Sequence, residues 1–280
     1  MNGKLTNIWT ALKSREEKRG RLFVNGNEVL VHVNIEFILG KSGELMIYDK
    51  VSKSYSCMLS NQELQQIKLK EGRNVAKLVF DDLKHKQLFD IYLLDQETKL
   101  VITDIDGTIT KSDFKGLLAK IFEYDHHHDG VVELFDAVSK NGYVLIYISA
   151  ISSSADELTR KYLFDQLQNI DGYSLPRSPL FMSPITWHKA LISQDKAAIK
   201  LSTLRSIIEL FDTKENVIAA AYGNKDTDTK AYLDSGIEPD KVFLINELGH
   251  MIDIGTETKT SYVEHFQNIS TMFPKYKCCQ

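Results

Sequence analysis

The first third of the chain alternates between apolar and polar residues in short runs. From Val29 to Leu39 every odd-numbered residue is apolar, while His32, Asn34 and Glu36 are polar. This period of two predicts a strand with one buried face. Turn residues flank the run on both sides, and similar short runs follow. These further strands are expected at Leu45–Tyr48, Asn74–Phe80 and Gln87–Leu94. Residues 21–98 are therefore expected to form an antiparallel β-sandwich.

After Lys99 the pattern changes to apolar strands that alternate with longer segments of helical period. The expected strands are Leu100–Thr103, Tyr143–Ile148, Val217–Tyr222 and Lys241–Ile245. The expected helices are Val131–Lys140, Ala155–Gln168, Ala197–Phe211 and Thr229–Ser235. Such alternation is typical of an α/β fold, in which helices cover both faces of a parallel sheet. We expect residues 99–280 to form a domain of this class.

The first twenty residues show a third pattern. Leu5, Ile8, Trp9 and Leu12 are spaced so that they share one face of a helix. Residues 1–21 hold six basic and two acidic residues. A basic amphipathic helix with a tryptophan is typical of a segment that lies on a membrane surface, which we expect for residues 1–20. The alternative is a helix whose apolar stripe packs on the protein's own core.

Composition and charge exclude some classes of protein for this chain. Of the 280 residues 43% are hydrophobic, enough for one large or two modest cores. The net charge of −4 argues against a nucleic-acid-binding protein. The three cysteines are too few for a disulfide framework and indicate a reducing compartment. The sequence shows neither a secretory signal nor an apolar run long enough to cross a bilayer, so membrane contact is expected at the surface.

The strongest chemical signal follows the strand expected at Leu100–Thr103. The apolar run ends in Asp104, Ile105, Asp106, Gly107 and Thr108, which places two carboxylates two residues apart. In an open α/β sheet, ligands bind beyond the carboxyl ends of the strands. An Asp-x-Asp pair alone is equally well explained by an ordinary acidic turn. The rest of the chain must decide between the two interpretations.

Further polar residues follow other strands and one helix of the same domain. Ser149 and Ala150 follow the second strand, Lys200 lies in a helical segment, and Asn224 and Asp228 follow the third strand. Taken singly, such a serine is usually a cap and such a lysine is usually solvated. Their order and spacing, taken together, favour a phosphoryl-transfer site, which needs mainly positioning and positive charge.

The residue types predict individual roles. Asp104 would attack phosphorus and form an aspartyl-phosphate, and Asp106 would protonate the leaving oxygen and then activate water. Ser149 would donate to a phosphoryl oxygen, and Lys200 would add positive charge. The adjoining Gly107, Thr108 and Ala150 complete the predicted catalytic and phosphate-binding set. An all-oxygen pocket suited to Mg²⁺ is expected from Asp104, Asp106, Asn224 and Asp228.

A cluster of histidines lies at Asp125-His126-His127-His128-Asp129. Consecutive histidines on regular secondary structure cannot all face one metal, so a zinc site is not favoured. A loop at the rim of the active site is the preferred interpretation. Trp187 and His188 either reach lipid beside the site or pack in the core.

The motifs together resemble a known family. Asp104 to Thr108, Ser149, Lys200 and Gly223-Asn224 with Asp228 resemble the four motifs of haloacid-dehalogenase-type phosphatases. More narrowly, the extension of the first motif through Ser112-Asp113, together with the segments 59–70, 141–143, 159–163 and 180–184, resembles the catalytic region of lipin-type phosphatidate phosphatases. This similarity covers roughly residues 58–275. A fainter one covers Phe37–Lys41, so the chain resembles a minimal member without the long variable insert.

The resemblance implies a fold and an activity. It implies an immunoglobulin-like β-sandwich over residues 21–98 and a haloacid-dehalogenase-like domain over 99–280. It also implies a cytoplasmic, Mg²⁺-dependent phosphatidate phosphatase that acts peripherally at membranes of the endoplasmic reticulum or nuclear envelope. Two positions depart from the family pattern, because Ile151 and Lys225 stand where arginines are usual. Each departure removes a bidentate phosphate donor.

The expected function is thus hydrolysis of phosphatidic acid to diacylglycerol and phosphate at a membrane surface. One alternative is a phosphatase of the same superfamily that acts on a soluble phosphomonoester. The other is a non-catalytic module that binds phosphatidate without hydrolysing it. The presence of Asp104, Asp106, Lys200 and Asn224 together speaks against the second. The oligomeric state is left open.

Overall fold

A change of architecture divides the chain. The fold comes from a computed structural model, which describes residues 18–29, 35–39, 45–49, 54–56, 65, 67–80, 86–111, 127–152, 156–183, 196–212 and 217–276. Two compact units are formed by residues 1–95 and 96–280. The change of sequence pattern predicted a boundary after residue 98. The predicted membrane residues Leu5, Ile8, Trp9 and Leu12, and the pair Trp187-His188, lie outside the described residues.

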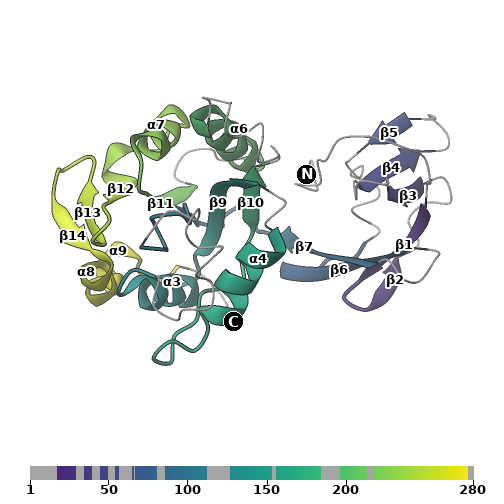
Figure 1. The fold of residues 1–280 in the computed structure, drawn as a ribbon, viewed down its shortest axis with the longest axis horizontal. Coiled ribbons are helices and arrows are strands. Elements are labelled where there is room, and N and C mark those ends of the chain that lie inside the picture. The colour runs from purple at the N-terminus through teal and green to yellow at the C-terminus, as the bar shows by residue number, and fades with distance from the viewer. Residues whose placement is uncertain are drawn as a thin grey trace. The chain divides into compact units, whose positions relative to one another are not determined.

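The described strands of the first unit form one antiparallel sheet (Figure 1). They are β1 (Lys18–Val24), β2 (Asn27–Val29), β3 (Ile35–Leu39), β4 (Leu45–Asp49), β5 (Ser54–Ser56), β6 (Gly72–Phe80) and β7 (Lys86–Leu93). The order is β5-β4-β3-β1-β6-β7, and β2 pairs with β1. The predicted strands at Leu45–Tyr48, Asn74–Phe80 and Gln87–Leu94 correspond to β4, β6 and β7. Of the run Val29–Leu39, the two ends belong to β2 and β3.

The period of two is visible in which side chains of this sheet are buried. Leu22 of β1 pairs with Leu78 of β6, and Val24 pairs with Ala76. All four are buried, whereas Val75 and Lys77, the neighbours of Ala76 in β6, are exposed. A strand with one buried face needs this alternation. The arrangement as an immunoglobulin-like sandwich is not confirmed, because the described strands belong to one hydrogen-bonded sheet.

One assignment at the beginning of the chain needs correction. Residues 18–20, predicted as the end of the N-terminal helix, belong to β1 and pair with β3. The apolar stripe that predicted the helix ends at Leu12, so it gave no information about these residues. The charged residues that follow it can occupy a strand as well as a helix.

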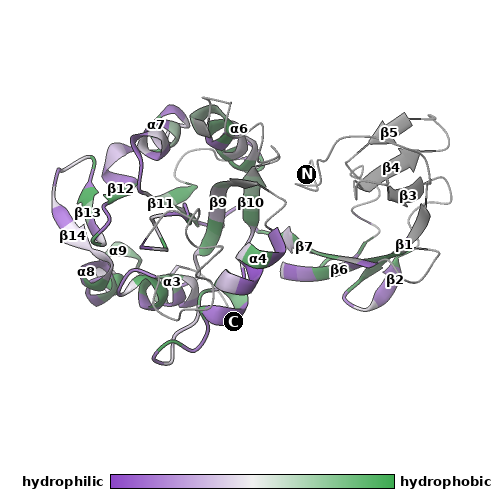
Figure 2. Cartoon of the chain, in the orientation of Figure 1, coloured by the Kyte–Doolittle hydropathy of each residue, from purple (hydrophilic) through white to green (hydrophobic). Residues whose placement is uncertain are grey.

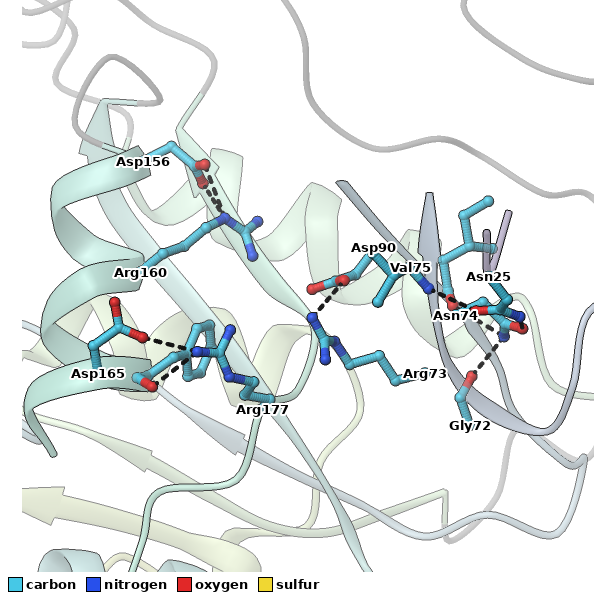
Figure 3. A network of polar contacts seen from close by, with 12 residues as sticks. Asn25, Gly72, Arg73, Asn74, Val75, Asp90, Asp156, Arg160, Asp165 and Arg177 are labelled. Carbon is cyan, nitrogen blue, oxygen red and sulfur yellow. Dashed lines mark hydrogen bonds and ion pairs between the residues drawn. The ribbon is translucent and has the colours of Figure 1, made fainter. Parts of the chain in front are cut away.

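A polar cluster joins β6 of the first unit to the turn before it (Figure 3). Asn74 is completely buried, and its amide nitrogen donates to the carbonyl oxygens of Lys70, Gly72 and Ile91 at 2.8, 3.0 and 3.3 Å. Its side-chain oxygen accepts from the Lys70 backbone and from the Asn25 amide, both at 2.9 Å. A buried amide bonded in this way fixes the local backbone without leaving an unsatisfied atom.

The second unit contains a mixed, largely parallel sheet of the order β10-β9-β8-β11-β12-β13-β14. Its strands are β8 (Leu100–Thr103), β9 (Val144–Ser152), β10 (Leu180–Ser183), β11 (Ile218–Gly223), β12 (Val242–Ile245), β13 (His250–Asp253) and β14 (Lys259–Ser261). The strands from β10 to β12 are parallel, and β13 and β14 add an antiparallel hairpin at one edge. The fold is therefore α/β, compatible with the predicted haloacid-dehalogenase-like class.

Helices cover both faces of this sheet, as Figure 1 shows. The helices are α3 (Val131–Lys140), α4 (Asp156–Lys161), α6 (Lys196–Ile208), α7 (Asp226–Asp234), α8 (Tyr262–Gln267) and α9 (Ile269–Met272), with a π-helical turn η2 (Tyr162–Gln166) and a 3₁₀ turn η3 (Pro239–Lys241). Helices α6 and α7 pack together on one face, and α3 packs with α8 and α9 on the other. Among the described residues, no helix is long and apolar enough to span a bilayer.

Burial on both faces explains why these strands are continuously apolar. All four residues of β8 are buried, and β11 is hydrophobic along its length in Figure 2. Helix α3 buries Val131, Leu134 and Phe135 against this sheet, while α7 has a mostly hydrophilic surface. Edge-to-face and stacked aromatic rings fill the core between β11 and α8, among them Phe135, Tyr222, Phe243 and Tyr262.

Candidate active site

The site begins where β8 ends. The backbone nitrogen of Asp104 still bonds to the Tyr222 carbonyl of β11 at 2.9 Å, so Asp104 remains fixed to the sheet. The chain then folds back, and the Ile105 carbonyl accepts from Thr108, Ile109 and Thr110 at 3.3, 2.9 and 3.2 Å. Such a turn needs a residue with positive φ, and Gly107 supplies it with φ of 76°. Asp106 is half-buried in this turn, whereas Asp104 is buried.

Lys200 of α6 joins two carboxylates beside this turn. Its Nζ lies 2.8 Å from Asp104 Oδ1 and 2.6 Å from Asp228 Oδ1. The three residues are only 5%, 3% and 1% exposed for Lys200, Asp104 and Asp228 respectively. A lysine buried to this degree is unfavourable unless carboxylates compensate its charge. The sequence predicted all three residues for the site, and the structure brings them into contact.

The electrostatic balance of this cluster sets its protonation. Burial lowers the pKa of Lys200, but the charges of Asp104 and Asp228 outweigh burial and raise the pKa above its usual value. Burial raises the pKa of Asp104 to about 6, with Lys200 opposing the shift and Asp228 adding to it. At pH 7 and above, Asp104 is therefore mostly ionised and Lys200 is charged.

Asp228 is held by the first turn of α7. Its Oδ2 accepts from the backbone nitrogens of Asn224 and Lys225 at 3.2 and 3.1 Å, so both of its oxygens are bonded. Gly223 leaves room for it, because a Cβ at that position would lie 2.6 Å from Asp228 Cβ. The turn after β11 thus positions Asp228 as the turn after β8 positions Asp104.

Asn224 closes the gap between the two turns. A Cβ at Gly107 would collide with the side-chain amide of Asn224, so only glycine allows this approach. The Asn224 Oδ1 atom is buried and has no hydrogen-bond partner among the residues that the structure describes. A buried, unpartnered carbonyl oxygen beside carboxylates is a suitable ligand for a hard cation. In the described ranges there is no group of three or more His, Cys, Asp or Glu side chains that could hold a metal, so the structure does not assemble Asp104, Asp106 and Asp228 into one metal site.

The serine motif lies inside a strand and not after one. Thr103, the last residue of β8, pairs with Tyr147, and β9 continues beyond it to Ser152. Ser149 is therefore buried two residues past the end of β8, at the same sheet edge as Asp104. Ala150 is half-buried beside it, and the Ile151 side chain lies outside the described residues.

Two tyrosines of the site were not predicted. Tyr262 of α8 donates its hydroxyl hydrogen to the Thr108 carbonyl at 2.9 Å, and Tyr232 of α7 donates to the Tyr222 carbonyl at 2.8 Å. Each fixes the backbone at the end of one strand. No local pattern connects them to the motifs, since Tyr262 is far from Thr108 in sequence. The Thr108 hydroxyl is buried and has no partner within the described part of the chain.

The histidine cluster is partly described and lies next to the first motif. His127 forms an antiparallel bridge with Thr110, and the nitrogen of His128 bonds to the Ile109 carbonyl at 2.9 Å. Asp129 is exposed and pairs with Lys111 at 2.9 Å. His128 itself is 1% exposed, so one residue of the predicted rim loop belongs to the interior.

The sequence matches a described family and several curated proteins. A profile of the LNS2 family (Lipin/Ned1/Smp2) matches residues 55–274. PAH1 of Arabidopsis thaliana, named a phosphatidate phosphatase, is 36% identical over 227 residues, 77% of this chain and 24% of that protein. LPIN1 of Homo sapiens, named a phosphatidate phosphatase, is 31% identical over 246 residues, which are 84% of this chain and 27% of that protein. Phosphatidic acid phosphohydrolase 1 of Saccharomyces cerevisiae is 33% identical over 207 residues, which are 69% of this chain and 24% of that protein. The chain spans about a quarter of the length of these relatives.

Proposed function

Since the chain belongs to the LNS2 (Lipin/Ned1/Smp2) family, we propose that it is a phosphatidate phosphatase, which hydrolyses phosphatidic acid to diacylglycerol and phosphate. The observation that carries the proposal is the buried cluster in which Lys200 contacts Asp104 and Asp228. A structural ion pair gains little from burial, whereas a phosphoryl-transfer site needs a nucleophile held against a fixed positive charge.

Asp104 is the proposed nucleophile. The backbone bond to Tyr222 fixes its position, and Lys200 favours its ionised form, so a carboxylate oxygen is available to attack phosphorus. The attack forms an aspartyl-phosphate and releases the lipid alkoxide. Asp106, which is more exposed than Asp104, then donates the proton to the leaving oxygen and later takes one from water. Lys200 and Ser149 would bind the phosphoryl oxygens through their hydrogens.

The proposed cofactor is Mg²⁺, with oxygen ligands from Asp104, Asp106, Asn224 and Asp228. When bound, the cation would supply positive charge against the phosphate oxygens. The unpartnered Oδ1 of Asn224 supports this choice, because amide and carboxylate oxygens are hard ligands. With isoleucine at 151 and an exposed lysine at 225, Lys200 is the buried cation proposed to face the phosphate.

We place the reaction at a membrane surface. The support is the apolar stripe of Leu5, Ile8, Trp9 and Leu12 on a basic N-terminal segment. Trp9→Ala should weaken sedimentation with phosphatidate vesicles while the hydrolysis of a water-soluble substrate is retained. An equal loss of both would assign these residues to packing.

Phosphate release distinguishes the proposed function from its alternatives. The chain is incubated with phosphatidate in vesicles and, separately, with glycerol 3-phosphate, each with and without Mg²⁺. The proposal predicts Mg²⁺-dependent release from phosphatidate and little release from glycerol 3-phosphate. Comparable release from both would favour a phosphatase for soluble phosphomonoesters. Vesicle binding without any release would favour a phosphatidate-binding module.

A further inference from the structure

His128 is a deeply buried histidine near the site that the proposed mechanism does not use. It is 1% exposed and lies just before α3, whose first residue donates to the His128 carbonyl at 3.3 Å. Its Nε2 atom is buried and has no hydrogen-bond partner among the described residues. A buried imidazole nitrogen with no partner is costly, so a reason for its presence is expected.

Several contacts join His128 and its neighbours to the turn after Asp106. The His128 nitrogen bonds to the Ile109 carbonyl, and His127 bridges Thr110. The imidazole also lies beside the Tyr262 ring, with centroids 6.2 Å apart, and the Tyr262 hydroxyl donates to the Thr108 carbonyl. The His128 backbone and the Tyr262 hydroxyl therefore bond to the same short turn.

The imidazole also lies near the Gly107 backbone. Burial lowers the pKa of His128, and a backbone hydrogen bond with Gly107 opposes that shift. From the other side, Gly249 comes so close that a Cβ there would lie 2.9 Å from His128 Nδ1. The imidazole is thus confined between the hairpin turn at Gly249 and the turn at Gly107.

Gly107 is the residue through which such a contact would reach the chemistry. It follows Asp106 directly, has positive φ and lies against the Asn224 amide. A shift of Gly107 would move Asp106 and would also change the close contact between Gly107 and the Asn224 amide. An error of about 1 Å in the placement of a catalytic group can cost about 10²-fold in rate.

We propose that His128 is a positioning residue, whose neutral imidazole holds the Gly107 backbone and thereby fixes Asp106 where it can protonate the leaving oxygen. The inference rests on the proposed function. It is specific to proton transfer, because Asp104 is fixed separately by its backbone bond to Tyr222 and by Lys200. Loss of His128 should therefore impair the step that needs Asp106 more than the attack by Asp104.

The test compares two water-soluble substrates that differ in their leaving groups. The leaving group of dioctanoyl phosphatidate is the diacylglycerol alkoxide, which needs a proton. The leaving group of p-nitrophenyl phosphate is a stable phenolate, which does not. For His128→Ala we expect kcat/KM, which reports the steps up to release of the leaving group, to fall about 10²-fold with the phosphatidate and less than about 10-fold with p-nitrophenyl phosphate. His128→Gln, which keeps an N–H donor, should recover part of the loss.

Controls separate this role from a structural one. His250→Ala removes an exposed histidine and should leave both rates unchanged. Gly249→Ala displaces the His128 ring without removing it and should give the same substrate-dependent loss, which keeps the test valid if His128→Ala does not fold. An equal loss with both substrates, or no loss with either, would overturn the inference while the wild-type activity upholds the proposed function. A wild-type chain inactive on both substrates would overturn the proposed function and this inference with it.

Discussion

Each unit buries a polar cluster, and the two clusters differ in how completely their atoms are bonded. In the first unit, Asn74 donates to three carbonyls and accepts from two nitrogens, so its amide has no unused hydrogen-bonding group. In the second unit, Asn224 leaves its Oδ1 unpartnered among the described residues, next to a buried group of three charges. A fully bonded cluster stabilises a fold, whereas an incompletely bonded one leaves atoms for a ligand.

The largest effect is expected from Lys200→Met. Asp104 and Asp228 would then be like charges without a compensating cation, and the phosphate would lose its buried positive charge. We expect kcat/KM to fall about 10³-fold and the free energy of unfolding to fall by about 3–5 kcal/mol. Steady-state kinetics and urea denaturation measure the two losses. Lys230→Met is the matched control, since Lys230 forms an exposed pair with Asp234 and should cost less than about 1 kcal/mol.

The next effect should fall on stability alone. Asn74→Ala removes five hydrogen bonds, four of them to partly buried backbone groups of Lys70, Gly72 and Ile91. We expect a loss of about 4 kcal/mol in the unfolding free energy, with kcat retained at temperatures where the protein is folded. Asn27→Ala changes an exposed asparagine of β2 and should have little effect. A large loss of kcat in folded Asn74→Ala would contradict the structural role.

The third effect concerns pH and the core of the second unit. Burial lowers the pKa of His265 to about 4, and its Nδ1 lies 3.1 Å from the Tyr222 hydroxyl oxygen. Above pH 6.5 both folded and unfolded states are neutral at this residue. As the pH falls from 6.5 to 4 the unfolded state binds the proton first, so up to about 3 kcal/mol of stability is lost. In His265→Phe, the unfolding free energy should no longer show this loss between pH 6.5 and 4. If the variant has the same pH dependence as the wild type, His265 is not the residue that causes the loss.

The smallest effect in this series sharpens the comparison of the two asparagines. Asn224→Ala removes an unpartnered oxygen, so we expect the unfolding free energy to change by less than about 1 kcal/mol. We expect kcat to fall about 10²-fold and the Mg²⁺ concentration for half-maximal activity to rise. Titration of activity with Mg²⁺ measures both. A stability loss equal to that of Asn74→Ala would mean that the two clusters serve the same purpose.

The predictions from sequence succeeded where one local pattern determines the structure. Strand β8 and helix α3 have the predicted bounds, because a run buried on both faces and a regular helical stripe are each sufficient signals. The edge of the sheet was missed: β10 and the hairpin β13–β14 are short and have no regular alternation. The helix expected over Ala155–Gln168 ends as a π-helical turn, and the composition of this segment does not indicate such a turn.

The site shows the same division. Motif order singled out Asp104, Lys200 and Asp228, which the structure brings into contact, and their catalytic roles stay a prediction. Parallel strands bring their carboxyl ends, and with them Asp104 and Asp228, to one edge of the sheet. Tyr262 and Gly249 were not assigned to the site, and His128 was assigned only to a rim loop, since their buried contacts depend on tertiary packing between distant segments. The saturation of Asn74 likewise depends on the pairing of β6 with β7 and on the turn before it, which the sequence pattern does not specify.

An acid quench during the first turnover can trap the covalent intermediate that we propose on Asp104. Phosphatidate labelled in its phosphate is mixed with excess wild-type chain and Mg²⁺, quenched within milliseconds to seconds, and the protein is digested for mass spectrometry. In the wild-type chain we expect a transient, hydroxylamine-sensitive phosphate on the peptide that contains Asp104. In Asp104→Asn we expect neither this adduct nor phosphate release. Phosphate release by Asp104→Asn at a rate near wild type, with no adduct in the wild-type chain, would contradict the proposed intermediate.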